Sequence, residues 1–122
     1  MNPIEALVDR YCQGWSDPDR SVRERCLREA LAPEATYTDP QVEALPIERL
    51  LVHIDGVLAS LPGARIERTS AVDVHHDVGR FQWRLSMADG SAPLEGIDFI
   101  DLDAGGRRIE RIVGFFGPVK GK

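Results

Sequence analysis

The chain has 122 residues, a formal net charge of −5 and a pI near 5.1, with 43% hydrophobic and 29% charged residues. This composition is typical of one globular domain that is long enough to enclose a single core. The acidic balance argues against a nucleic-acid surface, which would need a basic face. No apolar run approaches the ~18 residues of a membrane-spanning helix. We therefore expect neither a nucleic-acid partner nor a membrane segment.

The N-terminal residues and the two cysteines indicate the cellular compartment. Residues 1–5 lack the basic start and the apolar stretch of a signal peptide. Cys12 and Cys26 both fall in helical patterns and show neither CxxC nor metal-ligand spacing. We expect reduced, partly buried thiols in a cytoplasmic protein.

The first 61 residues predict three helices and one short strand. Apolar residues recur at helical spacing over 4–15, and again from a capping-box pattern at Ser21–Glu24 until Pro33. A short strand is predicted at 35–38, followed by a loop through 42–45. Pro46 suits the first turn of a third helix, which Pro62-Gly63 closes. This third helix has the clearest apolar stripe in the sequence.

After Gly63 the apolar period changes from 3.6 to 2, which indicates strands. Strands are expected at 66–74, 81–87, 94–102 and 109–116, separated by turn signals such as Asp89-Gly90 and Gly105-Gly106. Helices followed by hairpin-linked strands predict an α+β fold, with three N-terminal helices packed on a curved antiparallel sheet. We expect one domain over 1–117 with an internal cavity, and a flexible tail over 118–122.

Three residues are candidates for chemistry inside that cavity. Asp98 lies in the more apolar row of its strand, where an unpaired carboxylate is costly, so it should be protonated or hydrogen-bonded. Tyr11 lies on the apolar stripe of the first helix, and Asp39 ends the first strand directly before Pro40. Each has a plain structural alternative: a solvated acid, a core aromatic residue and a turn-forming Asp-Pro pair.

The histidines are weaker candidates. His75 and His76 are adjacent at the end of a predicted strand, so their side chains should point to opposite faces and not share a metal ion. His53 lies at the edge of the third helix's apolar stripe, where it either lines the cavity or packs at a helix–sheet boundary. We expect no metal site and no cofactor.

Several segments together resemble the SnoaL-like and ketosteroid-isomerase-like proteins of the nuclear transport factor 2-like superfamily, over about residues 4–116. The matching segments are Arg10-Tyr11, Leu31 to Pro40 with its A-T-x-x-D-P pattern, Glu95 to Phe99, and Gly106 to Ile109 leading to Phe115-Phe116. The resemblance implies a cone-shaped barrel around a cavity. It also implies a homodimer through the outer sheet face bearing Ile97, Phe99, Val113 and Phe115.

The resemblance implies a role for each candidate residue. Asp39 would be the general base of a cofactor-free isomerase, and Tyr11 and Asp98 would be the oxyanion donors. Such a site removes a proton from carbon next to a carbonyl group and stabilises the enolate oxygen; ketosteroid isomerase is itself the standard example of a neutral buried aspartic acid in this role. The expected cavity lining is Trp15, His53, Phe81, Trp83, Leu85, Ile112 and Phe116.

Two other functions remain open at this point. One is a non-catalytic module that binds a small hydrophobic molecule or serves dimerisation. The other is a SnoaL-like polyketide cyclase, which uses related acid–base chemistry. A limonene-epoxide-hydrolase type of site is disfavoured because it needs an asparagine partner, and Asn2 is the only asparagine in the chain.

Overall fold

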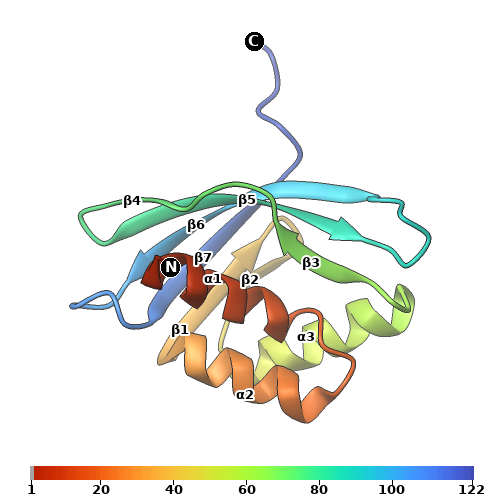
Figure 1. The fold of residues 1–122 in the computed structure, drawn as a ribbon, viewed down its shortest axis with the longest axis horizontal. Coiled ribbons are helices and arrows are strands. Elements are labelled where there is room, and N and C mark those ends of the chain that lie inside the picture. The colour runs from red at the N-terminus through yellow and green to blue at the C-terminus, as the bar shows by residue number, and fades with distance from the viewer. Residues whose placement is uncertain (1) are drawn as a thin grey trace.

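The computed structural model describes residues 2–122 and shows three helices packed against one face of a curved sheet (Figure 1). The helices are α1 (Pro3–Gly14), α2 (Arg20–Ala30) and α3 (Ile47–Ser60). The strands are β1 (Leu31–Asp39), β2 (Val42–Leu45), β3 (Arg65–Arg68), β4 (Asp73–His75), β5 (Val78–Ser86), β6 (Leu94–Leu102) and β7 (Ile109–Phe116). The predicted α+β class is therefore confirmed.

The sheet differs from the prediction in two respects. Its strand order is β2-β1-β7-β6-β5-β3, with β4 also paired to β5. Strand β1 runs parallel to β7, so the sheet is mixed and not wholly antiparallel. Strands β2 and β3 stand at its two ends, so it does not close into the expected barrel. Hairpin signals in the sequence predict only antiparallel pairing between strands that follow one another. The parallel pair β1–β7 joins segments about 75 residues apart in the sequence, which such signals do not reveal.

The second helix begins differently from the capping-box prediction. Its N-cap is Asp19, whose carboxylate accepts hydrogen bonds from the backbone N–H and the hydroxyl of Ser21. Ser21 therefore lies within the first turn of α2. The helix ends at Ala30, and Leu31 starts β1 directly, so the strand is longer than the predicted 35–38. Residues 42–45 form the edge strand β2 in place of the predicted loop.

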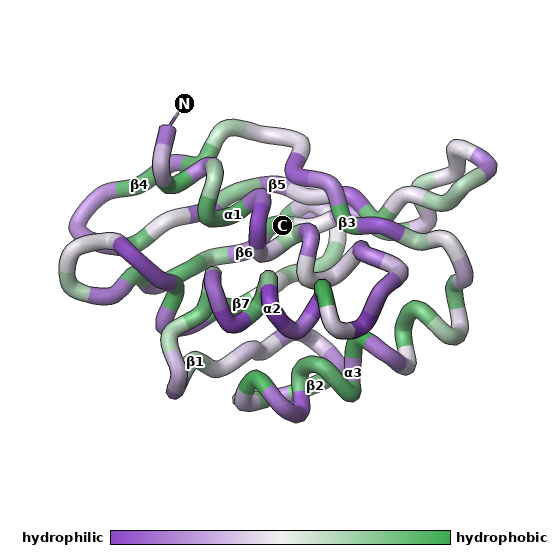
Figure 2. Tube along the Cα trace, turned by 60° about the horizontal axis from the view of Figure 1, so that its bottom comes forward, coloured by the Kyte–Doolittle hydropathy of each residue, from purple (hydrophilic) through white to green (hydrophobic). Residues whose placement is uncertain are grey.

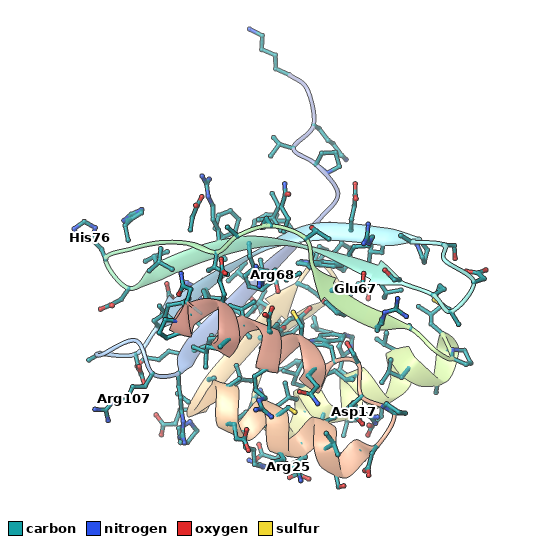
Figure 3. All side chains as sticks on the ribbon, in the orientation of Figure 1. Asp17, Arg25, Glu67, Arg68, His76 and Arg107 are labelled. Carbon is teal, nitrogen blue, oxygen red and sulfur yellow. The ribbon has the colours of Figure 1, made fainter. Side chains whose placement is uncertain are left out.

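The core lies between the helices and the sheet. Helix α3 is the most hydrophobic of the three, as Figure 2 shows, and it buries Ile47, Leu50, Leu51 and Ile54. Charged pairs hold the helices at the rim. Arg68 of β3 donates to Asp9 of α1 (2.7 and 3.0 Å), and it lies between sheet and helix in Figure 3. Arg23 of α2 donates to Asp55 of α3 (2.8 Å).

The remaining features of the chain follow from this layering. Residues 118–122 form no helix or strand and extend away from the sheet on the side opposite the helices (Figure 1). No helix within residues 2–122 is both long enough and apolar enough to cross a membrane. Cys12 and Cys26 are free and buried.

Candidate active site

A cavity of about 490 Å³ lies between α3 and the helix-covered face of the sheet. Its volume is in the range of roughly 300–1,000 Å³ that is usual for small-molecule sites. Its wall is mainly apolar. The residues that line it are Tyr11, Trp15, Tyr37, Asp39, Gln41, Val52, His53, Gly56, Val57, Ser60, Leu61, Ile66, Trp83, Leu85, Leu94, Asp98 and Phe116.

The structure brings the three candidate residues to this one cavity. Tyr11, Asp39 and Asp98 come from α1, β1 and β6, and all three lie on the wall with at most 8% of their surface exposed. Five of the seven expected lining residues are also on the wall: Trp15, His53, Trp83, Leu85 and Phe116.

Phe81 and Ile112 do not line the cavity, contrary to the expectation. Both are buried in the core, 2% and 0% exposed. They share the inward face of their strands with the wall residues Trp83, Leu85 and Phe116, but they lie further along those strands, within the packed core. Strand alternation gives the face of a side chain, not how far along the strand the cavity extends.

Asp39 is held by three donors. Its Oδ1 accepts from the backbone N–H of Gln41 (2.7 Å) and of Val42 (3.2 Å). Its Oδ2 accepts from the hydroxyl of Tyr37 (2.7 Å). A carboxylate oxygen has about two acceptor positions. Both positions of Oδ1 are therefore occupied, and one position of Oδ2 remains for a ligand.

Tyr11 is paired with Trp15, the C-cap residue of α1, four positions further along the chain. The Trp15 indole N–H donates to the Tyr11 hydroxyl oxygen over 2.9 Å in a buried setting. Since the hydroxyl is the acceptor in this bond, its own proton remains available to donate. Burial raises the pKa of Tyr11 well above its usual range, and the nearby Asp98 charge adds to the effect. Tyr11 is thus a neutral hydrogen-bond donor.

Asp98 is paired with Trp83 in the same manner. The Trp83 indole N–H donates to Oδ1 of Asp98 over 2.9 Å. Burial raises the pKa of Asp98 to about 7, the Asp39 charge acts in the same direction, and the bond from Trp83 lowers it. A substantial fraction of Asp98 therefore carries a proton at neutral pH.

Two glycines allow these side chains to fit. A Cβ on Gly96 would lie 2.6 Å from Cζ2 of Trp83, so the indole occupies the space above this residue. A Cβ on Gly114 would lie 2.7 Å from Oδ1 of Asp98 and 3.7 Å from Cβ of Asp39. Asp98 pairs with Gly114 in the β6–β7 ladder, and β7 lies between β6 and β1. The two acids therefore flank the bare backbone at Gly114.

Tyr37 is a site residue that sequence reasoning missed. It lies two positions before Asp39 on the same strand, so the period of two places both side chains on one face. Burial raises its pKa, and the neighbouring Asp98 and Asp39 carboxylates add to the effect, which keeps the hydroxyl a donor. Its ring also lies near Trp15 and His53, with centroid distances of 5.5 and 6.4 Å.

The other histidines lie outside this site. His75 ends β4, and His76 and Asp77 form the turn into β5 with positive φ angles of 50° and 61°. The two histidine side chains meet, with Nδ1 atoms 3.1 Å apart, and do not point to opposite faces as predicted. His76 is at the far tip of this hairpin in Figure 3. Within residues 2–122, no group of three or more His, Cys, Asp or Glu residues is arranged to hold a metal ion.

Comparison with known proteins rests on solved structures, since no family model and no curated protein matches the chain. A SnoaL-like family protein from Agrobacterium tumefaciens has a TM-score of 0.85 at 27% identity, with 97% of this chain and 100% of that chain covered. A candidate SnoaL-like polyketide cyclase from Jannaschia has a TM-score of 0.69 at 20% identity, covering 93% and 85%. A candidate ketosteroid isomerase from Kribbella flavida has a TM-score of 0.66 at 16% identity, covering 98% and 82%.

The chain has the fold of the nuclear transport factor 2-like superfamily, as the SnoaL-like and ketosteroid-isomerase-like structures do. The relationship predicted from the Leu31–Pro40 and Glu95–Phe99 segments is therefore confirmed. Members of this superfamily share a fold, and a fold hosts many functions, so the reaction has to be argued from the residues of the cavity.

Proposed function

We propose that the chain binds a hydrophobic carbonyl compound in the cavity and transfers a proton between two of its carbon atoms without a cofactor. The observation that supports this most is the convergence of one carboxylate and two O–H donors on a single apolar cavity. General bases and oxyanion donors are the groups that enolisation requires.

Asp39 is the base in this proposal. The free acceptor position on Oδ2 takes a proton from the carbon next to the carbonyl group. The electron pair of that C–H bond forms a C=C bond to the carbonyl carbon, and the π pair of the C=O bond moves onto the oxygen. The backbone N–H groups of Gln41 and Val42 hold the other oxygen in place. In a β,γ-unsaturated ketone, the same carboxyl group then returns the proton to the γ carbon, which gives the conjugated ketone and restores the carboxylate.

Tyr11 and protonated Asp98 are the donors to the enolate oxygen. In each residue an oxygen atom accepts a hydrogen bond from an indole N–H: the Tyr11 hydroxyl from Trp15, and Oδ1 of Asp98 from Trp83. The O–H proton of each residue is therefore left to donate to the ligand. Preorganised donors of this kind stabilise charge that develops in the transition state more than charge in the substrate. The mainly apolar wall lowers the local dielectric constant and so strengthens both interactions.

Turnover of a panel of β,γ-unsaturated ketones tests the proposal. The conjugated product absorbs in the ultraviolet, so conversion is followed directly in wild type, Asp39→Asn and the control Glu43→Gln. Glu43 is an exposed acid on the neighbouring strand β2. We expect wild type and the control to be equal and Asp39→Asn to be slower by about 10²–10⁴-fold.

The non-catalytic ligand-binding module predicts a different result. It gives wild-type rates no higher than buffer, while the ketones still bind. Equal rates in wild type and Asp39→Asn would also reject the proposed base. A SnoaL-like cyclase would leave the ketone panel unconverted and close a ring in a polyketide ester, and no feature of this cavity favours that reaction over proton transfer.

A further inference from the structure

The cavity holds two buried acids with no basic partner. None of the salt bridges found among residues 2–122 involves Asp39 or Asp98. The donors to these acids are a phenol, an indole and backbone N–H groups, and all of them are neutral. Buried carboxylates are normally balanced by a cation because low-dielectric surroundings make an isolated charge costly.

The rest of the wall holds no permanently charged cation. Of the described residues that line the cavity, none is a lysine or an arginine, and His53 is the one basic side chain. The two acids lie on either side of Gly114, where β7 presents no side chain to the cavity. A cationic ligand in the cavity would balance the charge of Asp39 and of the ionised fraction of Asp98.

The wall around the acids is aromatic. Trp15, Tyr37 and His53 form one cluster with centroid distances of 5.5–6.4 Å, and Trp83 contacts Phe116 edge to face at 6.0 Å. Both indole N–H groups are used on Tyr11 and Asp98, so the tryptophans offer carbon surface to the cavity. Aromatic rings attract a cation placed over their faces, and quaternary ammonium groups suit such surroundings.

We infer that the cavity is also a binding site for hydrophobic cations, namely quaternary or protonated tertiary ammonium compounds, whose charge Asp39 and Asp98 balance and whose carbon atoms pack on the aromatic wall. This goes beyond proton transfer, because the cation needs no reactive carbon. Cation and ketone occupy the same volume and therefore compete.

A pair of ligands with equal shape isolates the charge. Neopentylbenzene has a neutral carbon atom at the position where benzyltrimethylammonium has its positively charged nitrogen, and the two molecules are otherwise the same. Binding is read from tryptophan fluorescence, since the two tryptophans of the chain are Trp15 and Trp83 and both line the cavity. We expect the wild-type protein to bind the cation about tenfold or more tighter than its neutral analogue.

Acid-to-amide variants locate the effect. Asp39→Asn and Asp98→Asn should each reduce the preference for the cation and leave affinity for neopentylbenzene unchanged or higher. The exposed acid Glu95 on β6 supplies the control, and Glu95→Gln should keep the full preference. Equal affinities of the two ligands for wild type would overturn the inference, as would a full preference in both aspartate variants, because the attraction would then come from the overall net charge.

The wild-type comparison does not depend on the folding of any variant. It also involves no turnover, so the ammonium site and the proposed proton transfer are tested separately.

Discussion

The Trp83 indole N–H donates a hydrogen bond to Oδ1 of Asp98. Trp83 lies on β5 and Asp98 on β6, and these two strands pair in the sheet. This bond makes the two oxygens of Asp98 unequal. Oδ1 is the acceptor for the indole, so the proton of the acid form is placed on Oδ2. In the proposed reaction, the protonated oxygen is therefore the one left to donate to the ligand.

Removing the indole N–H should shift the pH dependence of turnover. The acid form of Asp98 is the donor, and its pKa is about 7, so the rate should fall as pH rises through about 7. Trp83→Phe removes the interaction that lowers this pKa, so the fall should move to higher pH. Asp98→Asn, with an amide donor that does not titrate, should lack the fall. A pH profile that is unchanged in Trp83→Phe would contradict the assigned bond.

Asp98 should also make stability depend on pH. Its pKa is 3.8 when unperturbed and about 7 in the folded protein. The unfolded chain releases this proton first, so the stabilisation is complete below about pH 4 and is lost as pH rises to about 7. The difference between the two pKa values corresponds to a loss of roughly 4 kcal/mol, as an upper estimate, in the free energy of unfolding. Urea unfolding at pH 4.5 and 8 should show wild type losing more stability than Asp98→Asn; equal losses would contradict the shifted pKa.

Two glycine substitutions should have opposite effects on stability. A Cβ on Gly114 meets Oδ1 of Asp98 at 2.7 Å, so Gly114→Ala should destabilise by about 1–3 kcal/mol and displace the acid. A Cβ on Gly56, inside α3, meets no atom within 4 Å, so Gly56→Ala should stabilise the helix by about 0.5–1 kcal/mol. Thermal unfolding of both variants measures this contrast, and destabilisation of equal size would show that the space at the two sites is not as described.

The outer sheet face should form a homodimer. Phe99 and Phe115 are 39% and 55% exposed and contact each other edge to face at 5.9 Å, on the face that the helices leave uncovered. Exposed apolar patches of this kind usually mark interaction surfaces. Light scattering should give a dimer for wild type and a monomer for Phe115→Glu, with Glu95→Gln remaining dimeric. A monomeric wild type would rule out the dimer.

The elements of this fold were largely predictable, whereas their long-range pairing was not. Periods of 3.6 and 2 are local properties, so α3, β6 and β7 were expected where they occur. The parallel pairing of β1 with β7 and the open ends of the sheet depend on packing between distant segments. At α2, Asp19 and Ser21 are both good capping residues, and the sequence pattern favoured the wrong one.

The candidate site shows the same division. Asp39, Tyr11 and Asp98 were singled out from sequence and line one cavity, but the partners that hold them were not predicted. Tyr37 was accessible from the spacing i, i+2 on a strand, and the Trp15–Tyr11 bond from i, i+4 on a helix. The Trp83–Asp98 bond required the register between β5 and β6, which only the folded sheet provides. Phe81 and Ile112 were misplaced because alternation does not locate the end of a cavity.

Hydrogen–deuterium exchange at the α carbon of a bound ketone tests the central claim most directly. Enolisation in D₂O replaces the α proton with deuterium even when no isomer is released, and NMR of the ketone records it. We expect wild type to exchange the α proton well above the buffer rate and Asp39→Asn to fall to near the buffer rate. Exchange by wild type at the buffer rate, or equal exchange by the two proteins, would contradict the assignment of Asp39 as the base.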